Sequence, residues 1–146
     1  MIPKPSQVRY KRRVSKHTRK KATSERRKLE IRCRELTAIL VKRRDNYTCQ
    51  RCGRTEEQGY KIDAAHVLPK GRYPRMQFEL LNILALCFVC HSDFWHGESQ
   101  GLPWFKEKYP QRWAVIQIAN AVSRKVDLKE LLIVLEAECT AGGAPR

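Results

Sequence analysis

The chain has 146 residues, which is enough for one modest domain. Its net charge of +15 at pH 7 indicates a polyanionic partner. No apolar run approaches the roughly 20 residues that a membrane-spanning helix needs, and the first residues lack the apolar segment of a secretory signal. We therefore expect neither a membrane protein nor a secreted one, and we predict a cytoplasmic location in a bacterium or a phage-infected cell.

The basic charge is concentrated at the N-terminus. Residues 1–28 carry twelve lysines and arginines against one acidic residue, a net charge of +11, whereas residues 29–146 carry only +4. Residues 1–23 show no usable hydrophobic period, so we expect a flexible basic arm that is disordered when free and bound to DNA when engaged. The nucleic-acid contacts predicted in this arm are Lys11, Arg12, Arg13, Lys20 and Lys21.

A helix is predicted over residues 24–44. Ser24 is suited to cap its start, and apolar side chains recur at intervals of three and four residues along one face. These side chains are Leu29, Cys33, Leu36 and Leu40. Asp45 and Asn46 end the helix and turn the chain toward the first cysteine pair.

Two Cys-x-x-Cys pairs, Cys49/Cys52 and Cys87/Cys90, predict a structural zinc site. Thiolates are soft ligands, and four of them close a tetrahedral site. Gly53 supplies the positive φ that such a turn often needs. The alternatives are four free core thiols or a redox pair, and the presence of two pairs disfavours the latter. Cys33 and Cys139 are predicted to be inert buried thiols.

The segment between the two pairs predicts a short strand over 60–67, a loop opened by Pro69 and Gly71, and an apolar stretch over 78–86. A short helix over 87–95 follows, with Gly97 as a stop signal. Beyond Gly101 we expect a helix that is broken at Pro110, a second one ending near 124–125, and a last helix capped by Asp127. Trp104 and Trp113 are predicted to be core residues. Residues 141–146 are expected to be a disordered tail.

Three histidines are candidates for chemistry. His66 ends the predicted strand, and a neutral imidazole can take a proton from water near pH 7, although a lone histidine is also common in a purely structural role. His91 follows Cys90 directly, which suits it to bind a second, catalytic metal ion. His96 lies about 140° from His91 around an ideal helix, so it joins that site only if the helix unwinds near Gly97. Asn82 either bonds the loop around His66 through its side chain or forms a turn before a strand.

The motifs Cys-x-x-Cys, Ala-His-Val-x-Pro and Leu-x-Asn-x-x-x-Leu-Cys-x-x-Cys-His together resemble the HNH, or ββα-metal, endonuclease superfamily over residues 45–100. Residues 104–109 and the helices after them are similar to phage recombination endonucleases of the NinG (Rap) type. The resemblance implies an α+β fold with a small ββα-metal core stapled by the four-cysteine zinc site and flanked by an N-terminal helix and C-terminal helices, in one domain over 24–140.

The resemblance also implies a mechanism. His66 would be the general base, Asn82 the orienting residue and His91 a ligand of one catalytic cation, Mg²⁺ or Mn²⁺. The products would carry a 5′-phosphate and a 3′-hydroxyl. Many members of the superfamily have a metal ligand just before the catalytic histidine, where this chain has Ala65. Asp63, one pleat away, and His96 are the candidates to replace it.

A metal-dependent DNA endonuclease, a phosphodiester hydrolase acting on double-stranded or branched recombination intermediates, is therefore the function predicted. Lys70, Arg72 and Arg75 are expected either to grip phosphates beside the cut or to be ordinary solvated charges. Two other functions stay open. One is a non-catalytic zinc-stabilised nucleic-acid-binding module, and the other is a restriction or toxin-type nuclease. Resolution of a junction needs two cuts, so that substrate would imply a homodimer.

Overall fold

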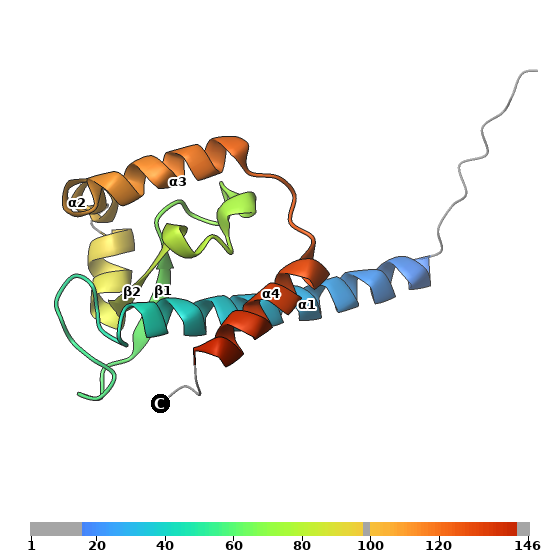
Figure 1. Cartoon of the computed structure of the whole chain (residues 1–146), viewed down its shortest axis with the longest axis horizontal. Helices are drawn as coiled ribbons and strands as arrows, with labels where there is room; N and C mark the ends of the chain where they lie inside the picture. The colour runs from blue at the N-terminus through green and yellow to red at the C-terminus, as the bar shows by residue number, and fades with distance from the viewer. Residues whose placement is uncertain (1–15, 98–99, 143–146) are drawn as a thin grey trace, which may run out of the picture.

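The computed structural model describes the backbone of residues 16–97 and 100–142 and the side chains from Ser24 onward within these ranges. Its longest element is helix α1, Lys16–Arg44, which runs along the molecule from right to left in Figure 1. The helix ends where the sequence predicts, but it starts eight residues earlier. Lysine, arginine and alanine favour helix even where no apolar stripe exists, and neither proline nor glycine interrupts residues 16–23. The predicted arm is thus helical from Lys16, and Lys11, Arg12 and Arg13 lie outside the described residues.

The end of α1 is a left-handed turn. Asn46 and Tyr47 have φ of 52° and 51°, and the Tyr47 N–H donates to the Lys42 carbonyl at 2.8 Å. Asparagine tolerates this conformation better than most residues. The prediction that Asp45 and Asn46 end the helix is confirmed.

A two-stranded antiparallel sheet forms the centre of the molecule. Strand β1, Ile62–His66, pairs with β2, Ile83–Cys87, so that Ile62 lies opposite Cys87 and His66 lies opposite Ile83. Every residue of β2 is buried. Strand β1 is shorter than the strand predicted over 60–67. Two single 3₁₀ turns, η1 (Pro74–Met76) and η2 (Leu80–Asn82), precede β2, so the apolar stretch over 78–86 is extended only from Ile83 onward.

The helix after the second cysteine pair is a π-helix, η3, Cys90–Gly97. Helical backbone begins at Phe88, one residue later than predicted, because Cys87 still belongs to β2. Helix α2, Gly101–Lys108, and helix α3, Pro110–Val122, follow. Pro110 is the first residue of α3, a position where its missing N–H costs nothing. Trp104 and Trp113 pack against the core around the sheet, which confirms their predicted role.

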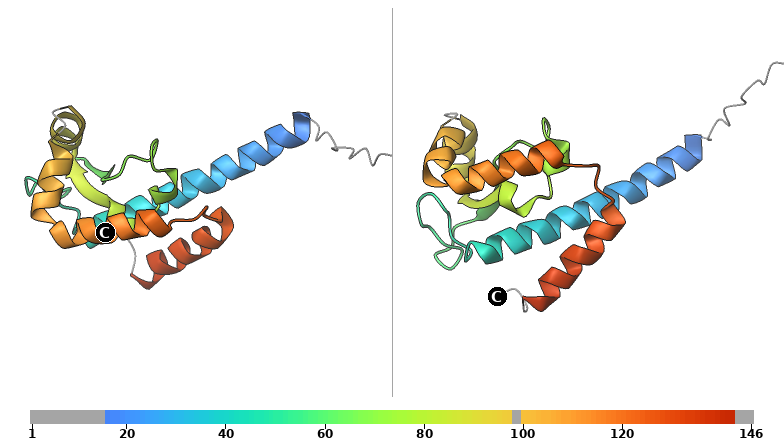
Figure 2. Two further views of the ribbon diagram at one scale, coloured as in Figure 1. Left: turned by 90° about the horizontal axis from the view of Figure 1, so that it is seen from above. Right: turned by 45° about the horizontal axis from the view of Figure 1, so that its top comes forward.

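Helix α4, Leu128–Ala141, is capped as predicted, because Asp127 Oδ1 accepts from the Lys129 N–H at 2.8 Å. It packs on α1 through an apolar cluster that contains Cys33, Leu36 and Leu135. Helix α1 therefore lies between α4 on one side and the strands on the other (Figure 2). The fold is α+β, as predicted, and residues 143–146 of the predicted tail lie outside the described residues.

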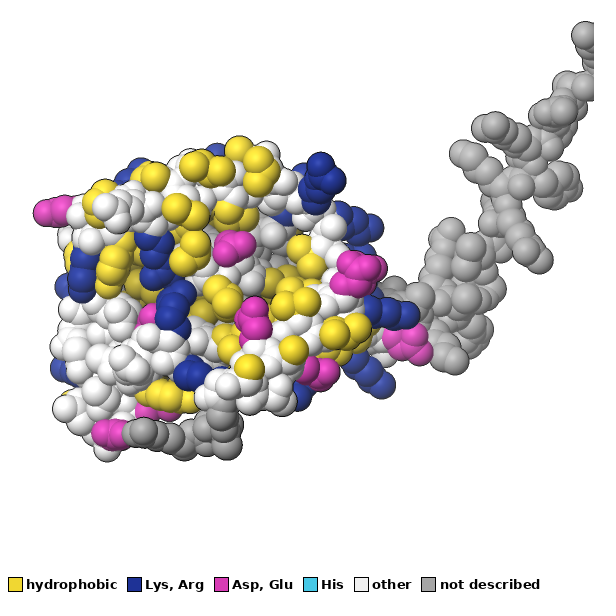
Figure 3. All heavy atoms as spheres, in the orientation of Figure 1, with side chains coloured by type: hydrophobic (Ala, Val, Ile, Leu, Met, Phe, Trp, Pro, Cys, Tyr) yellow, Lys and Arg dark blue, Asp and Glu magenta, His cyan; other side chains and the backbone are white. Residues whose placement is uncertain are grey.

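The surface of the described residues mixes charge types on the face shown in Figure 3. Lysine and arginine side chains lie next to hydrophobic ones over much of this face, with single acidic side chains between them. The positive charge of the chain is therefore not confined to its N-terminal end.

Within the described ranges, no helix combines the length and the apolar character that crossing a bilayer would require.

Candidate metal centre and histidine site

Four cysteines meet at one end of the sheet. The Sγ atoms of Cys49, Cys52, Cys87 and Cys90 all lie within 4.8 Å of one another, and those of Cys52 and Cys87 are 3.7 Å apart. Two ligands of a tetrahedral zinc ion, each about 2.3 Å from the metal, are separated by about 3.8 Å. The donor set and its geometry therefore fit a metal ion such as zinc, as the sequence predicts.

Local backbone structure builds each half of this centre. In the first half, the Cys49 N–H donates to the Arg54 carbonyl at 2.7 Å, and Gly53 closes the turn with φ of 77°. A bridge between Thr48 and Thr55 fixes the base of that turn. The second half continues from the end of β2, so pairing of the two strands places Cys87 and Cys90 against the first turn.

The environment of the thiols differs from one cysteine to the next. Burial raises the pKa of Cys49, but backbone hydrogen bonds from Cys52, Cys87 and Arg51 outweigh burial and bring that pKa down to about 7. Burial raises the pKa of Cys90 to about 12, although the Arg51 guanidinium, 3.5 Å from its sulfur, opposes the rise. Backbone N–H groups and a cation directed at sulfur are typical surroundings of a thiolate cluster.

His66 occupies the last position of β1. Its Nε2 lies 2.9 Å from the Gln77 carbonyl oxygen, and its own carbonyl accepts from Trp95 Nε1 at 3.1 Å. A carbonyl can only accept, so Nε2 carries the proton in the neutral ring and Nδ1 keeps its lone pair.

Burial of the His66 ring lowers its pKa below the ordinary value of an imidazole, and the hydrogen bond to Gln77 offsets part of this effect. The positive charges of Lys70 and Arg34 lower the pKa further, and a protonated His91 would act in the same direction. The ring is therefore neutral at pH 7.

Asn82 is fully buried, with 0% of its surface exposed, and bonds the loop that follows His66. Its Oδ1 accepts from the Leu68 N–H at 2.8 Å, and its Nδ2 donates to the carbonyls of Leu68 and Met76 at 3.1 and 3.0 Å. Both interpretations of this asparagine hold, because its side chain bonds the loop after His66 and its backbone ends the turn η2 directly before β2.

Two arginines hold the backbone next to Asn82. Arg44 from α1 and Arg112 from α3 both donate to the Ile83 carbonyl, at 2.8 and 2.7 Å. Burial lowers the pKa of Arg112 to about 10, which still leaves it charged at pH 7. Helices α1 and α3, one on each side of the sheet segment in the sequence, thus fix the position of the backbone at Ile83.

The two histidines of η3 face each other. His91 Nε2 and His96 Nε2 are 3.2 Å apart, and the ring centroids are separated by 4.9 Å. The expectation that His96 would need an unwound helix is wrong, because a π-helix repeats at i→i+5 and brings residues five apart to one side.

Asp63 approaches the same pair from β1, with its Oδ2 3.6 Å from His91 Nδ1. His91 therefore meets His96 with one ring nitrogen and Asp63 with the other. Among the described residues, the four cysteines are the group of three or more potential ligands close enough to share an ion. Ala65 is fully buried and offers no ligand.

The basic residues around His66 have different environments. Arg75 Nη1 donates to the Ser123 carbonyl at the end of α3, at 3.1 Å, and the Arg72 guanidinium lies 5.7 Å from the Tyr73 ring centroid. Lys70 is exposed and adds its positive charge to the surroundings of His66, as Arg34 does from α1.

Arg34 lowers the pKa of His66 from α1, an influence that the sequence does not reveal. It pairs with Glu30 on the surface of α1 and acts on His66 from there. Nothing in a helical pattern relates it to a histidine 32 residues later, so no sequence signal could have found it.

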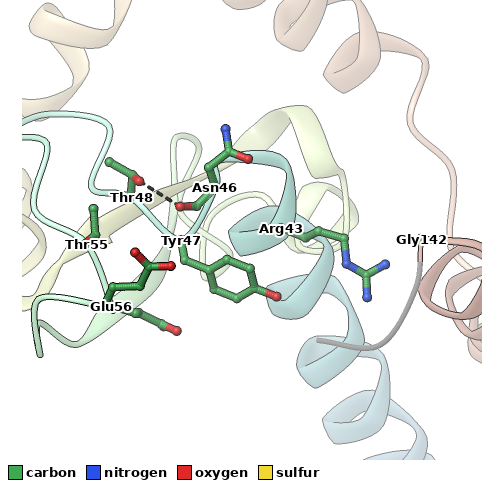
Figure 4. Close-up of a pocket in the computed structure, with 8 residues that line it drawn as sticks. Arg43, Asn46, Tyr47, Thr48, Thr55, Glu56 and Gly142 are labelled. Carbon is green, nitrogen blue, oxygen red and sulfur yellow. Dashed lines mark hydrogen bonds between the residues drawn. The ribbon is translucent and has the colours of Figure 1, made fainter. Parts of the chain in front are cut away.

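A cavity of about 670 Å³ lies away from these side chains, at the end of α1 (Figure 4). Its walls include Tyr47, Glu56 and Gly142, and Glu56 is already paired with Lys42 at 2.7 Å. None of the predicted site residues lines it. We therefore place the candidate site at the histidines and cysteines rather than in this cavity.

Comparisons with protein-family models, with curated proteins and with solved structures find no match to this chain.

Proposed function

We propose that the protein is a metal-dependent DNA endonuclease of the HNH type. The observation that carries this proposal is the pair of imidazole nitrogens on η3, His91 Nε2 and His96 Nε2, 3.2 Å apart. Two nitrogens that each lie about 2.1 Å from one metal ion are separated by about 3.0 to 3.4 Å. The pair therefore has the spacing of two ligands of a single cation.

Asp63 takes a different role from the one predicted for it as a ligand. It faces Nδ1 of His91, whereas the cation would lie at Nε2. A carboxylate on the far nitrogen of a metal-binding histidine fixes the tautomer and the orientation of the ring. At 3.6 Å the two atoms are too far apart for a hydrogen bond, so in this proposal they move closer when the cation binds. We assign Asp63 as the residue that orients His91.

His66 takes the proton of the attacking water in this proposal. Because Nε2–H is engaged by the Gln77 carbonyl, Nδ1 is the accepting atom. Asn82 keeps the strand end and the following loop in place, so the ring is oriented before substrate binds. When bound, a divalent cation at His91 and His96 supplies the Lewis acid that stabilises charge on the scissile phosphate.

The duplex would be held by positive charge next to His66. Lys70, in the loop after β1, and Arg34, on α1, both act electrostatically on this ring and lower its pKa. Helix α1 carries lysine and arginine over residues 16–34 and again over residues 42–44. Each phosphate neutralised by such side chains releases counterions, so binding would weaken steeply with added salt.

The decisive experiment uses zinc-loaded protein and linear, flapped and four-way-junction DNA, with Mg²⁺, Mn²⁺ or no added divalent cation. Cleavage that requires the added cation and disappears in His66→Ala, but not in the surface control Gln117→Ala, supports the enzyme. Avoiding chelators keeps the cysteine centre intact. DNA binding without cleavage under every cation would refute the endonuclease proposal.

A second candidate, a non-catalytic module that binds nucleic acid, is favoured by one observation. Ala65 contributes no ligand, so a bound cation would have two protein ligands instead of three. The experiment above distinguishes this module from the enzyme, since only the enzyme cuts.

A further inference from the structure

Two large apolar side chains are exposed at the second cysteine turn. Phe88 and Val89, which separate Cys87 from Cys90, are 58% and 49% exposed, although every residue of β2 just before them is buried. Both ends of this two-residue tip are held by cysteines of the metal centre, so a bound ion would make it rigid. A rigid, protruding apolar tip is suited to insert into a partner.

Two cationic side chains lie beside the tip, and one of them, Lys61, is also paired with Asp63 at 3.2 Å. Lys61 Nζ lies 6.0 Å from the Phe88 ring centroid, and the Phe88 N–H donates to the Lys61 carbonyl at 3.1 Å. On the other side of the turn, the Arg51 guanidinium lies against Cys90 and over the Phe94 ring. An aromatic face beside cations complements a nucleobase joined to its phosphate. A second copy of this chain is a less suitable partner for the tip, because its own cations would repel those of the first copy.

Strand pairing fixes how far the tip lies from His66. Cys87 pairs with Ile62, and His66 is four residues further along β1. At about 3.3 Å per residue, this separation is about 13 Å. The same distance along duplex DNA corresponds to about four base pairs at roughly 3.4 Å each.

We propose that Phe88 and Val89 form a wedge that stacks on an exposed base about four base pairs from the phosphate at His66. A closed duplex hides the faces of its bases, so the wedge must first separate two of them, which costs free energy. At a junction or flap the bases beside the branch are already partly unstacked, and this cost is smaller. The wedge thereby selects branched DNA, an inference that rests on the nucleic-acid binding of the proposed function.

The test measures binding without any added divalent cation, to a four-way junction and to a linear duplex with the same arm sequence. Phe88→Ala should weaken junction binding about tenfold, the scale of losing one stacked base, and change duplex binding less than about twofold. Phe88→Trp should restore junction binding. Ile118→Ala, which removes a 65% exposed side chain from α3, is the matched control and should change neither. Zinc content near one ion per chain in each variant shows that the centre is intact.

A fluorescent adenine analogue placed at successive positions in the junction maps the wedge. Quenching that is maximal about four base pairs from the cleaved or protected phosphate, and that is lost in Phe88→Ala, supports the proposal. Equal loss of junction and duplex binding, no loss in Phe88→Ala, or an equal effect of Ile118→Ala overturns it. Because no catalytic cation is present, a protein that needs Phe88 for junctions but never cuts supports the wedge while refuting the nuclease. In the cleavage assay of the proposed function, equal cutting of branched DNA by the wild-type protein and Phe88→Ala would support the nuclease and refute the wedge.

Discussion

Nε2 of His91 and Nε2 of His96 lie 3.2 Å apart on one side of a π-helix, while Nδ1 of His91 faces Asp63. This relationship gives the three residues unequal roles. In the proposed site, the two imidazoles would supply ligands and the carboxylate would orient one of them.

His96→Ala should weaken binding of Mn²⁺ by about tenfold to a hundredfold, because one of two protein ligands is lost, and should reduce cleavage at low Mn²⁺. Calorimetric titration of zinc-loaded protein with Mn²⁺ measures the affinity directly. Ser92→Ala, a change in the same helix away from the ring contact, is the control. Unchanged Mn²⁺ affinity in His96→Ala would remove His96 from the site.

Asp63→Asn should have a smaller effect, about tenfold on Mn²⁺ affinity, because the ring of His91 stays in place but its orientation is less restrained. Lys61→Ala, which removes the ammonium 3.2 Å from the other oxygen of Asp63, is the matched control. If Asp63→Asn abolishes Mn²⁺ binding as completely as His91→Ala does, Asp63 is a direct ligand rather than an orienting residue.

Removal of zinc should unfold the centre of the protein. Two cysteine turns far apart in the sequence meet at a small two-stranded sheet, and few contacts other than a bound ion hold them together, among them the bond from the Gln50 N–H to the Ala85 carbonyl and the contact of Arg51 with Cys90. We expect one zinc ion per chain, loss of that ion in Cys87→Ser, and retention in Cys139→Ser. Metal analysis and circular dichroism measure these outcomes, and a folded Cys87→Ser protein without zinc would contradict the prediction.

The lowered pKa of His66 predicts how stability and activity depend on pH. The unfolded chain binds a proton near pH 6.5, while the folded ring resists protonation, so the His66 contribution is complete above about pH 6.5 and is lost as pH falls toward the folded pKa. Urea unfolding should show this loss, and His66→Gln should reduce it. Cleavage at saturating Mn²⁺ should stay near its maximum at pH 6.5, and a half-maximal rate there would contradict the shift.

Asn82→Ala should destabilise the protein by about 3 kcal/mol, because three backbone groups in the interior lose their partner. It should also lower the cleavage rate, since the loop after His66 loosens. Asn120→Ala on α3 tests the same chemical change without these contacts. Urea unfolding of both variants gives the comparison, and equal stabilities would refute the role of Asn82.

Features that depend on local chemistry could be predicted from the sequence. The turn at Asn46 that follows α1 and the cap at Asp127 follow from the conformations and hydrogen bonds available to single side chains. The cysteine cluster follows from two short spacings and the chemistry of thiolates, and it needs no knowledge of the path between them.

Features that depend on tertiary packing could not. The nearness of Arg34 to His66 arises from the way α1 crosses the sheet, which helical periodicity does not specify. The start of α1 at Lys16 was missed because an apolar stripe is only one of two reasons for a helix, and intrinsic propensity is the other. The place of Asp63 depends on which nitrogen of His91 it meets, a detail that strand alternation alone leaves undecided.

The π-helix has a consequence for recognising such a site in other chains. Deletion of one residue between His91 and His96, such as Asp93, would leave the histidines four apart, the spacing that an ordinary α-helix brings to one face. Two proteins that differ by one residue in length can therefore present the same imidazole pair through different helical forms. A pattern search restricted to His-x-x-x-His would pass over this chain, and allowing one extra residue would recover it.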